Sequence, residues 1–205
     1  MAYNAVMHVL VTAGNTQAPI DRVRCITNIF TGRTGSAIAT FARLAHHTVT
    51  VMNSITGPVA VKPFTGLTAL GYRTFDELRA LMADRIPGGS FDAIIHCAAV
   101  SDYLPAGVFA ADRVTPIENA GKLKSDAPEV WLRLVRAPKL VDMIRHEWGF
   151  RGVLVKFKLE VGIDDEKLLS IAESSRMQSD ADLMVACRAA RCGQYLIPSP
   201  TAKRR

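Results

Sequence analysis

The sequence has no apolar run long enough to cross a bilayer. Runs such as Ala93–Ile95 and Val153–Val155 fall far short of the roughly 20 residues that a spanning helix needs. The N-terminus does not join a basic flank to a long apolar core, as secretory signals do. We therefore expect a cytoplasmic protein with no membrane partner.

Cysteine is also scarce, and its spacing carries no metal or redox signature. The four residues are Cys25, Cys97, Cys187 and Cys192, none of them in a CxxC pair, and no histidines cluster at ligand spacing. Cys97 and Cys187 end apolar runs, where cysteine usually packs as a small hydrophobic residue. We expect reduced thiols and no metal held by the protein itself.

Two binding signatures are missing as well. The GxGxxG fingerprint of dinucleotide-binding proteins is absent, which argues against a dehydrogenase. The formal net charge of +6 favours anionic partners, whether nucleotides, phosphorylated metabolites or nucleic acid. No recognition helix, zinc finger or RNA-binding motif supports the nucleic-acid option, so no nucleic-acid partner is expected.

What the chain does contain is an alternation of strand-length apolar runs and amphipathic helical stretches. At 205 residues, 49% hydrophobic and 21% charged, it has the size and balance of one soluble domain. Such alternation predicts an α/β fold with a parallel sheet covered on both faces. The expected strands are Val6–Val11, Thr48–Met52, Phe91–Ala99, Glu129–Val135, Gly152–Phe157 and Asp182–Ala186, and the expected helices are Gly35–Leu44, Phe75–Ala83, Pro138–Trp148 and Asp164–Met177. Thr74 is the expected N-cap of the second helix.

The stretch from Tyr103 to Pro128 differs from the rest. It carries three prolines and two glycines and shows no clear period. A connection of this length is uncommon in a compact domain unless it is functional, so we expect a flap or extended loop over about 103–128. The sequence therefore predicts one domain over 1–205, with a divergent tail from about 188 to 205.

Three segments fall at expected strand ends, where ligands bind in open α/β sheets. Thr12–Gly35 ends in glycines before a helix and could hold a phosphate, although a glycine-rich turn has the same composition. Ala98–Tyr103 has small residues followed by Asp102, which could contact a ligand or cap a turn. Gly121–Ser125 carries lysines that could close over a reacting phosphate or lie in solvent.

Together these segments resemble the phosphopantothenate–cysteine ligase family, also called phosphopantothenoylcysteine synthetase, in its single-domain form. Each motif alone is weak, but their order and spacing hold from about residue 6 to 187. The matching motifs are Leu10–Thr16 (LVTAGNT), Ile20–Gly35 (IDxVRxIxNxxxGxxG), Ile95–Pro105 (IHCAAVSDYxP), Lys122–Ser125 (KLKS), Leu134–Lys139 (LxxxPK), Phe157–Glu160 (FKLE) and Ala181–Ala186 (ADLxVA).

The resemblance implies a Rossmann-like three-layer α/β fold with a flap that also serves as a dimerisation extension. It implies that CTP or ATP activates the carboxylate of 4'-phosphopantothenate as an acyl-nucleotidylate, which the amine of cysteine then attacks in coenzyme A biosynthesis. A carboxylate resists nucleophiles, whereas a mixed anhydride has a good leaving group. Magnesium usually accompanies the triphosphate in this family, and the expected assembly is a homodimer.

The resemblance also assigns residues. Asn28 corresponds to the asparagine that holds the activated carbonyl, and Lys122 to the flap lysine needed to form the intermediate. Arg24 corresponds to an arginine that reaches into the neighbouring subunit to hold the substrate. The expected acid-binding residues are Gly14, Arg24, Gly32, Gly35, Ala98, Ala99 and Asp102, and the expected nucleotide-binding residues are Ala98, Asp102, Lys122, Pro138, Lys139, Leu140, Val141 and Phe157.

Four features depart from the family pattern. Phe30 replaces a small hydroxyl residue, so either its ring lies where the substrate would bind or the loop turns differently. The stretch Ser174–Ser179 has only Arg176 where the family has several lysines for the triphosphate, and each lost charged contact removes about 1.5–3 kcal/mol. Arg188 stands where it could replace that charge. The chain after Pro198 is shorter than the family's usual closing strand and helix.

Three functions therefore stay open. The first is the ligase itself, supported by the joint presence of Asn28, Arg24, Asp102 and Lys122. The second is a related ligase with another acid or nucleotide, in which Phe30 and the missing lysines are adaptations. The third is a non-catalytic subunit that binds a nucleotide or metabolite.

Overall fold

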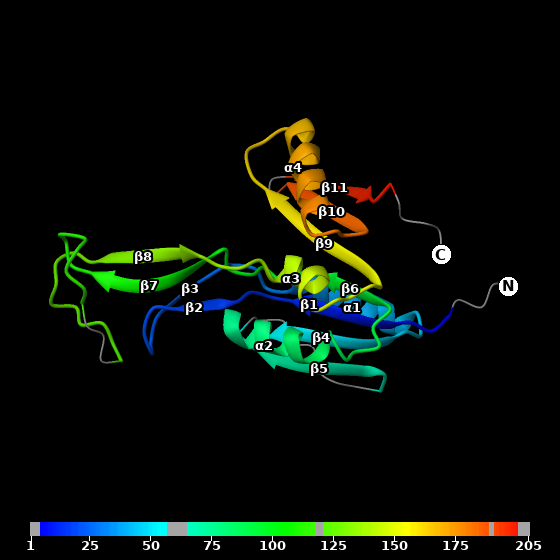
Figure 1. The fold of residues 1–205 in the computed structure, drawn as a ribbon, viewed down its shortest axis with the longest axis horizontal. Coiled ribbons are helices and arrows are strands. Elements are labelled where there is room, and N and C mark those ends of the chain that lie inside the picture. Colours follow the sequence, from blue (N-terminus) through cyan, green and yellow to red (C-terminus); the bar gives the residue numbers. More distant parts are fainter. Residues whose placement is uncertain (1–4, 57–64, 118–120, 189–190, 201–205) are drawn as a thin grey trace.

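The computed structural model describes residues 5–56, 65–117, 121–188 and 191–200, with side chains left undescribed at 191–194. A seven-stranded sheet runs through its centre in the order β11-β10-β9-β6-β1-β4-β5 (Figure 1). Within the described ranges, no helix combines the length and apolarity that crossing a membrane requires. The strands are β1 (His8–Ala13), β4 (Thr48–Ser54), β5 (Leu67–Tyr72), β6 (Ala93–His96), β9 (Val153–Glu160), β10 (Leu183–Arg188) and β11 (Arg191–Pro198).

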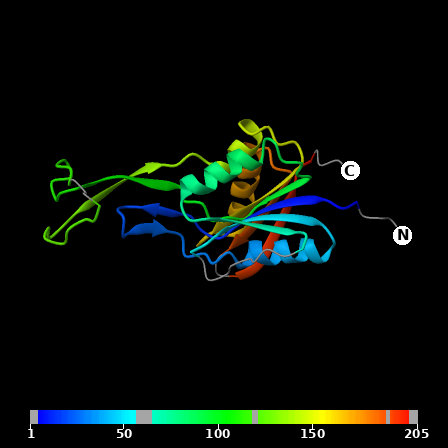
Figure 2. The same cartoon turned by 90° about the horizontal axis from the view of Figure 1, so that it is seen from below.

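In the described part of the chain, four helices complete the three layers. They are α1 (Arg33–Leu44), α2 (Phe75–Arg85), α3 (Leu140–His146) and α4 (Asp165–Gln178). Alternate strand residues face opposite sides of the sheet, so Val9 and Val11 pack with α1, whereas Leu10 packs in the cluster that α2 and α3 cover. Helix α4 packs on β10 and β11 (Figure 2). The predicted Rossmann-like three-layer fold is confirmed.

Helix α2 illustrates how local sequence sets an element's start. The Thr74 side chain accepts a hydrogen bond from the Glu77 amide, and the Glu77 carboxylate accepts from the Thr74 amide, which is a capping box. The predicted N-cap is therefore confirmed. Asp164 is the N-cap of α4, and its side chain accepts from the Lys167 amide without a reciprocal bond.

Two small ribbons lie outside the main sheet. Strands β2 (Gln17–Pro19) and β3 (Cys25–Thr27) pair antiparallel, as do β7 (Tyr103–Phe109) and β8 (Trp131–Arg136). The β7–β8 ribbon projects well beyond the body of the domain (Figures 1 and 2). We call it the arm. The first seven residues of the stretch expected to be a flap or extended loop form β7, whose pairing register with β8 shifts between Pro105 and Val108.

The sheet also differs from the prediction at both edges. Strand β5 was not expected, because its sequence is short and includes Gly71. Strand β11 was not expected either, and it runs antiparallel to β10, since only two residues connect them and a parallel crossover needs a dozen or more. The sheet is mostly parallel, as expected, with β11 as its antiparallel strand, and this strand lies in the tail expected from about residue 188.

Candidate functional site

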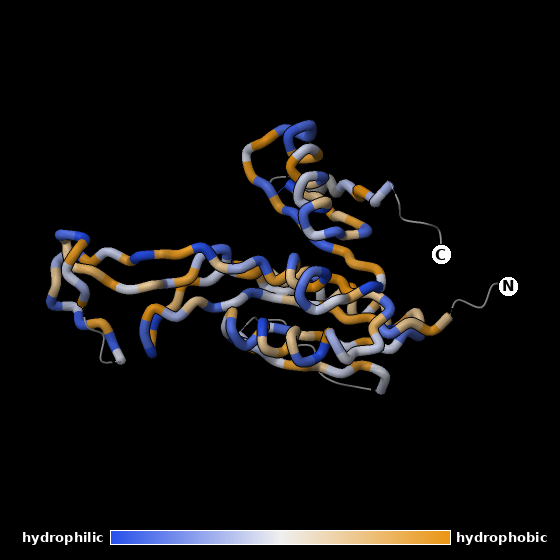
Figure 3. The backbone as a smooth tube through the Cα atoms, in the orientation of Figure 1, coloured by the Kyte–Doolittle hydropathy of each residue, from blue (hydrophilic) through white to orange (hydrophobic). Residues whose placement is uncertain are grey.

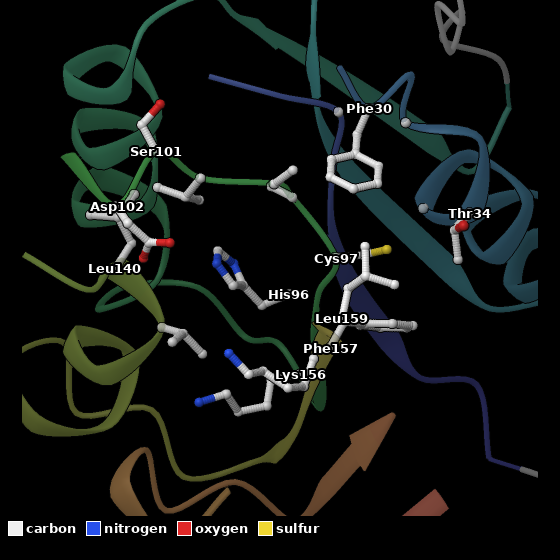
Figure 4. Close-up of a pocket in the computed structure, with 18 of the residues that line it drawn as sticks. Phe30, Thr34, His96, Cys97, Ser101, Asp102, Leu140, Lys156, Phe157 and Leu159 are labelled. Atoms are coloured by element: carbon white, nitrogen blue, oxygen red, sulfur yellow. The ribbon is translucent and has the colours of Figure 1, made fainter. Parts of the chain in front are cut away.

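A cavity of about 420 Å³ lies at the carboxyl ends of β1, β6 and β9 (Figure 4). Parallel strands place their following turns at one edge, so segments distant in sequence meet there. Eleven residues predicted from the sequence line this cavity. They are Gly14, Gly32, Gly35, Ala98, Ala99, Asp102, Pro138, Lys139, Leu140, Val141 and Phe157.

Three glycines let the start of α1 press against the end of β1. Gly14 and Gly32 have φ values of 91° and 82°, which disfavour residues with a side chain. A Cβ on Gly35 would lie 2.6 Å from the Ala13 Cβ, and one on Gly32 would lie 3.0 Å from the Gly14 nitrogen. The close approach brings the N-terminus of α1, with its partial positive charge, to the cavity wall beside Thr34 (Figure 4).

Asn28 lies beside the cavity but is absent from its lining. Its Nδ2 donates to the Ala99 carbonyl oxygen at 3.0 Å, and its own carbonyl accepts from Asn15 Nδ2 at 2.7 Å. The amide therefore holds the loop before α1 against the strand end that forms one wall. Thr16 and Ser101 reinforce the contact, because the Ser101 amide donates to Thr16 Oγ1 at 2.9 Å.

Asp102 and Lys139 face each other across the cavity's edge. Lys139 Nζ donates to Asp102 Oδ1 at 3.1 Å, and both side chains are well exposed. An ion pair this exposed contributes at most about 1 kcal/mol, so a ligand can displace it at little cost. The helix expected to open at Pro138 in fact begins at Leu140, with Lys139 in the N-cap position.

Lys156 is a buried cation that sequence reasoning missed. Its Nζ donates to the carbonyl oxygen of Ser175 at 2.9 Å and to the hydroxyls of Ser175 and Ser179. Its pKa is lowered to about 8, chiefly by burial and also by the positive charges of Lys139 and Lys158, while Asp142 opposes the shift. These contacts join β9 to α4. The Lys156 side chain also lines the cavity (Figure 4).

The lining is strongly positive overall. Among its described residues, Arg33, Lys139, Lys156 and Lys158 carry positive charge and Asp102 alone is acidic, a formal charge of +3. Such a cavity attracts polyanions, phosphates in particular. One carboxylate is also too few to cage a divalent ion, which fits magnesium carried mainly by phosphate oxygens.

His96 adds a neutral polar group. It is buried, its Nδ1 lies 3.0 Å from Thr12 Oγ1, and burial together with the charge of Lys156 lowers its pKa to about 4. The register of the sheet pairs it directly with Lys156. A polar residue at the end of the otherwise apolar strand β6 was the signal that could have revealed His96.

The apolar part of the lining combines expected and unexpected residues. Phe30 lies at the cavity, as its departure from the family pattern predicted, and is about half-exposed (Figure 4). Cys97 and Cys187 also line the cavity, although both were expected to be ordinary packing residues. Burial raises the pKa of Cys97 to about 11, so it is a neutral thiol at physiological pH. Both are free, as is Cys25, and the Cys192 side chain lies outside the described residues.

Two arginines considered as triphosphate contacts serve the fold instead. Arg176 is buried, donates to both carboxylate oxygens of Glu173 at 2.7 Å and to the Ala181 carbonyl at 2.8 Å. Arg188 pairs with Asp165 at 2.7 Å. Neither lines the cavity. Of the two, only Arg188 had been expected to be able to replace the missing charge, and its pairing with Asp165 does not support that role.

Arg24 and Lys122 do not reach the cavity of their own chain either. The structure instead brings their segments to each other, since Arg24 Nη2 donates to the carbonyl oxygen of Leu123 at 2.9 Å. Lys122 itself is exposed.

The chain resembles known proteins over nearly its whole length. It is 33% identical over 178 residues to the coenzyme A biosynthesis bifunctional protein CoaBC of Thermococcus kodakarensis, and 28% identical over 180 residues to that of Escherichia coli. These alignments cover 87% and 88% of this chain but only 40% of each relative. The chain thus spans well under half the length of these relatives.

Solved structures agree with this fold. The DNA/pantothenate metabolism flavoprotein of Streptococcus pneumoniae superposes with a TM-score of 0.81 at 25% identity, covering 95% of this chain and 93% of that one. A Cab2 variant in complex with phosphopantothenate-cysteine superposes at 0.68 with 16% identity, covering 95% and 80%. The family model described as the DNA/pantothenate metabolism flavoprotein C-terminal domain matches residues 5–197. The chain therefore belongs to the family of DNA/pantothenate metabolism flavoprotein C-terminal domains.

Proposed function

We propose that this protein joins 4'-phosphopantothenate to cysteine in coenzyme A biosynthesis, with CTP or ATP as co-substrate. The observation that carries the proposal is the meeting of the glycine turns, the strand end at 98–102 and the 138–141 segment around one positively charged cavity. A triphosphate and a phosphorylated acid are both polyanions, and a formal charge of +3 suits them.

The proposed reaction has two steps, formation of the acyl-nucleotidylate and its attack by cysteine. A carboxylate oxygen of the acid attacks the α-phosphorus, the bond to the β-phosphate oxygen breaks, and pyrophosphate leaves. The amine of cysteine then attacks the acyl carbon, the bond to the nucleotide oxygen breaks, and the amine loses a proton as the nucleoside monophosphate departs. Magnesium, where it is bound with the triphosphate, would neutralise phosphate charge, and Asp102 could supply one oxygen ligand.

The residues of the chain take separate roles. Gly14, Gly32 and Gly35 let backbone amides approach the acid, as the crowded backbone around them suggests. Asn28, held at the 98–100 wall, would orient the activated carbonyl. Lys139, Lys156 and Lys158 would bind phosphate oxygens, and Phe157 would contact the base.

We further propose that two copies act together. The arm exposes Tyr103, Leu134 and Val135, apolar side chains that a second copy could cover. Arg24 and Lys122 lie outside the cavity of their own chain, which suits a site completed by a neighbouring subunit.

The test is pyrophosphate release that requires both the acid and a nucleoside triphosphate, followed by amide formation when cysteine is added. Asn28→Asp should form the acyl-nucleotidylate but transfer it to cysteine poorly, because a carboxylate repels the electron-rich carbonyl oxygen that an amide would hold. Equal amide formation by this variant would refute the role of Asn28. Ligand-dependent thermal stabilisation without any turnover would favour a non-catalytic binding subunit instead.

A separate observation favours the second hypothesis, a related ligase that uses another acid or nucleotide. Phe30 lines the cavity where the family pattern has a small hydroxyl residue. Turnover of another carboxylic acid in preference to phosphopantothenate, measured across several acids and triphosphates, would support altered specificity.

A further inference from the structure

The loop that carries Lys122 is attached to the turn that carries Arg24. Residues 121–123 and 21–24 are about a hundred positions apart in the chain, yet three separate hydrogen bonds join them. The Arg22 amide donates to the Gly121 carbonyl at 2.9 Å, Arg24 Nη2 donates to the Leu123 carbonyl at 2.9 Å, and the Leu123 amide donates to Asp21 Oδ2 at 3.0 Å.

Asp21 is the centre of this contact. Its other oxygen, Oδ1, accepts from the amides of Val23 and Arg24, both at 2.7 Å. The Arg24 guanidinium lies 3.4 Å from Oδ2, and the Asp21 side chain is fully covered. The hydrogen bond from Leu123 is the largest of the effects that hold the pKa of Asp21 below its usual 3.8, so this carboxylate is ionised at neutral pH.

The two oxygens of Asp21 have different tasks. Oδ1 shapes the local turn, as an aspartate does in many turns. Oδ2 accepts from the Leu123 amide, outside that turn, and lies 3.4 Å from the Arg24 guanidinium. A side chain needed for the turn alone would not require the second contact.

We propose that Asp21 is a positioning residue that fixes the Lys122 loop to the Arg24 turn, so that both cations approach the reacting acid as one unit. The inference rests on the proposed function for its catalytic part. Lys122 stays exposed while its neighbour Leu123 is buried, so the anchored loop still presents the ammonium to a ligand. Anchoring removes loop freedom before the reaction and so lowers the entropy cost of placing Lys122.

The Asp21→Asn variant tests whether Asp21 fixes the Lys122 loop, because it leaves the rest of the turn nearly unchanged. The amide oxygen can still accept from Val23 and Arg24, but the amide nitrogen cannot accept from Leu123. A matched control is Asp112→Asn, because Asp112 also accepts from two backbone amides, those of Val114 and Thr115, in a turn of the arm that makes no such contact with Leu123. Leu123→Pro removes the same hydrogen bond from the opposite side.

Two measurements do not depend on ligand. Hydrogen exchange at the Leu123 amide should accelerate roughly tenfold to a hundredfold in Asp21→Asn. Tryptic cleavage after Lys122 should accelerate in Asp21→Asn, and Asp112→Asn should match the wild type in both assays. In Leu123→Pro the bond to follow is the one after Lys124, because trypsin does not cut a Lys–Pro bond, and its cleavage should accelerate as well. Unchanged exchange and cleavage in the Asp21 variant would overturn the proposal.

The third measurement is pyrophosphate release with saturating acid and triphosphate. Asp21→Asn and Leu123→Pro should each lower kcat about tenfold or more, with a smaller change in KM for the nucleotide. Asp112→Asn should keep the wild-type rate. A faster-exchanging loop with an unchanged kcat would overturn the positioning role. If the wild type releases no pyrophosphate, the proposed function fails, while exchange and cleavage still decide whether Asp21 anchors the loop.

Discussion

Replacing Lys156 with methionine should weaken nucleoside triphosphate binding without unfolding the protein. Methionine has about the length of lysine but no charge. The variant therefore loses the buried cation that β9 presents to the cavity and keeps Lys158. Two unit charges about 5 Å apart interact by roughly 3 kcal/mol at an effective dielectric constant of about 20. Charge-assisted hydrogen bonds contribute about 1.5–3 kcal/mol. Both values predict a dissociation constant about ten to a hundred times higher.

The pH dependence gives a second, independent signature. Burial lowers the pKa of Lys156 to about 8, so the ammonium predominates at pH 7 and is lost as the pH rises through this value. A bound polyanion favours the charged form, and affinity should therefore fall above about pH 8. The Lys156→Met variant should lack this decline.

The assay is calorimetric titration with CTP and with ATP at several pH values on both sides of 8, with thermal midpoints recorded for each variant. Lys167→Met is the control, because Lys167 is exposed near the start of α4 and does not line the cavity. A Lys156 variant with wild-type affinity and an unchanged pH profile would refute a phosphate-binding role. It would leave Lys156 as a structural link between β9 and α4.

Three further predictions concern other parts of the molecule. Arg176→Met should lower the free energy of unfolding by about 1–3 kcal/mol in a denaturant titration, because it leaves the buried Ala181 carbonyl without its donor, yet triphosphate affinity should stay within about twofold. Gly35→Ala should lower the free energy of unfolding by about 1–3 kcal/mol and weaken binding of the acid, because the new Cβ would lie 2.6 Å from the Ala13 Cβ. An unchanged thermal midpoint would mean that α1 can move away from β1 freely. Thr74→Ala should cost about 1 kcal/mol through loss of the capping box, with no effect on ligand binding.

Much of the fold could be predicted because local and global preferences agree in it. The apolar β-branched runs around β1 and β4 have strand length, and Thr74 and Asp164 mark helix starts by their side-chain chemistry. The edge strands β5 and β11 were missed, because an edge strand packs on fewer neighbours and its sequence is less distinctive.

Some residues of the candidate site could be predicted from the sequence and others could not. Glycines and strand-end residues such as Ala98 and Asp102 were predictable, because their position after a strand already places them at the ligand edge. Lys156 and Lys158 were not, since alternation of charged and apolar residues in β9 is typical of a half-exposed strand. Only the pairing of β9 with β6, and the packing of α4 over it, shows that Lys156 faces a cavity instead of solvent.

The attachment of the Lys122 loop to Asp21 was beyond any sequence pattern. Backbone groups of Gly121 and Leu123 make these contacts, and backbone groups have no signature in side-chain identity. For the long stretch between β7 and β8, only the length and the composition could be used for prediction.

The central strands β1, β6 and β9 are neighbours in space but widely separated along the chain, with Leu10 beside Ile94 and Ile94 beside Leu154. A nascent polypeptide therefore cannot assemble the cavity floor until β9, which ends at Glu160, has left the ribosome, and α4, which holds Lys156, follows later still. Pairings over such distances form slowly, because the intervening segments must first be brought together. Ligand capture during synthesis should consequently appear abruptly, only once α4 has emerged, and chains released earlier should have no affinity for nucleotide.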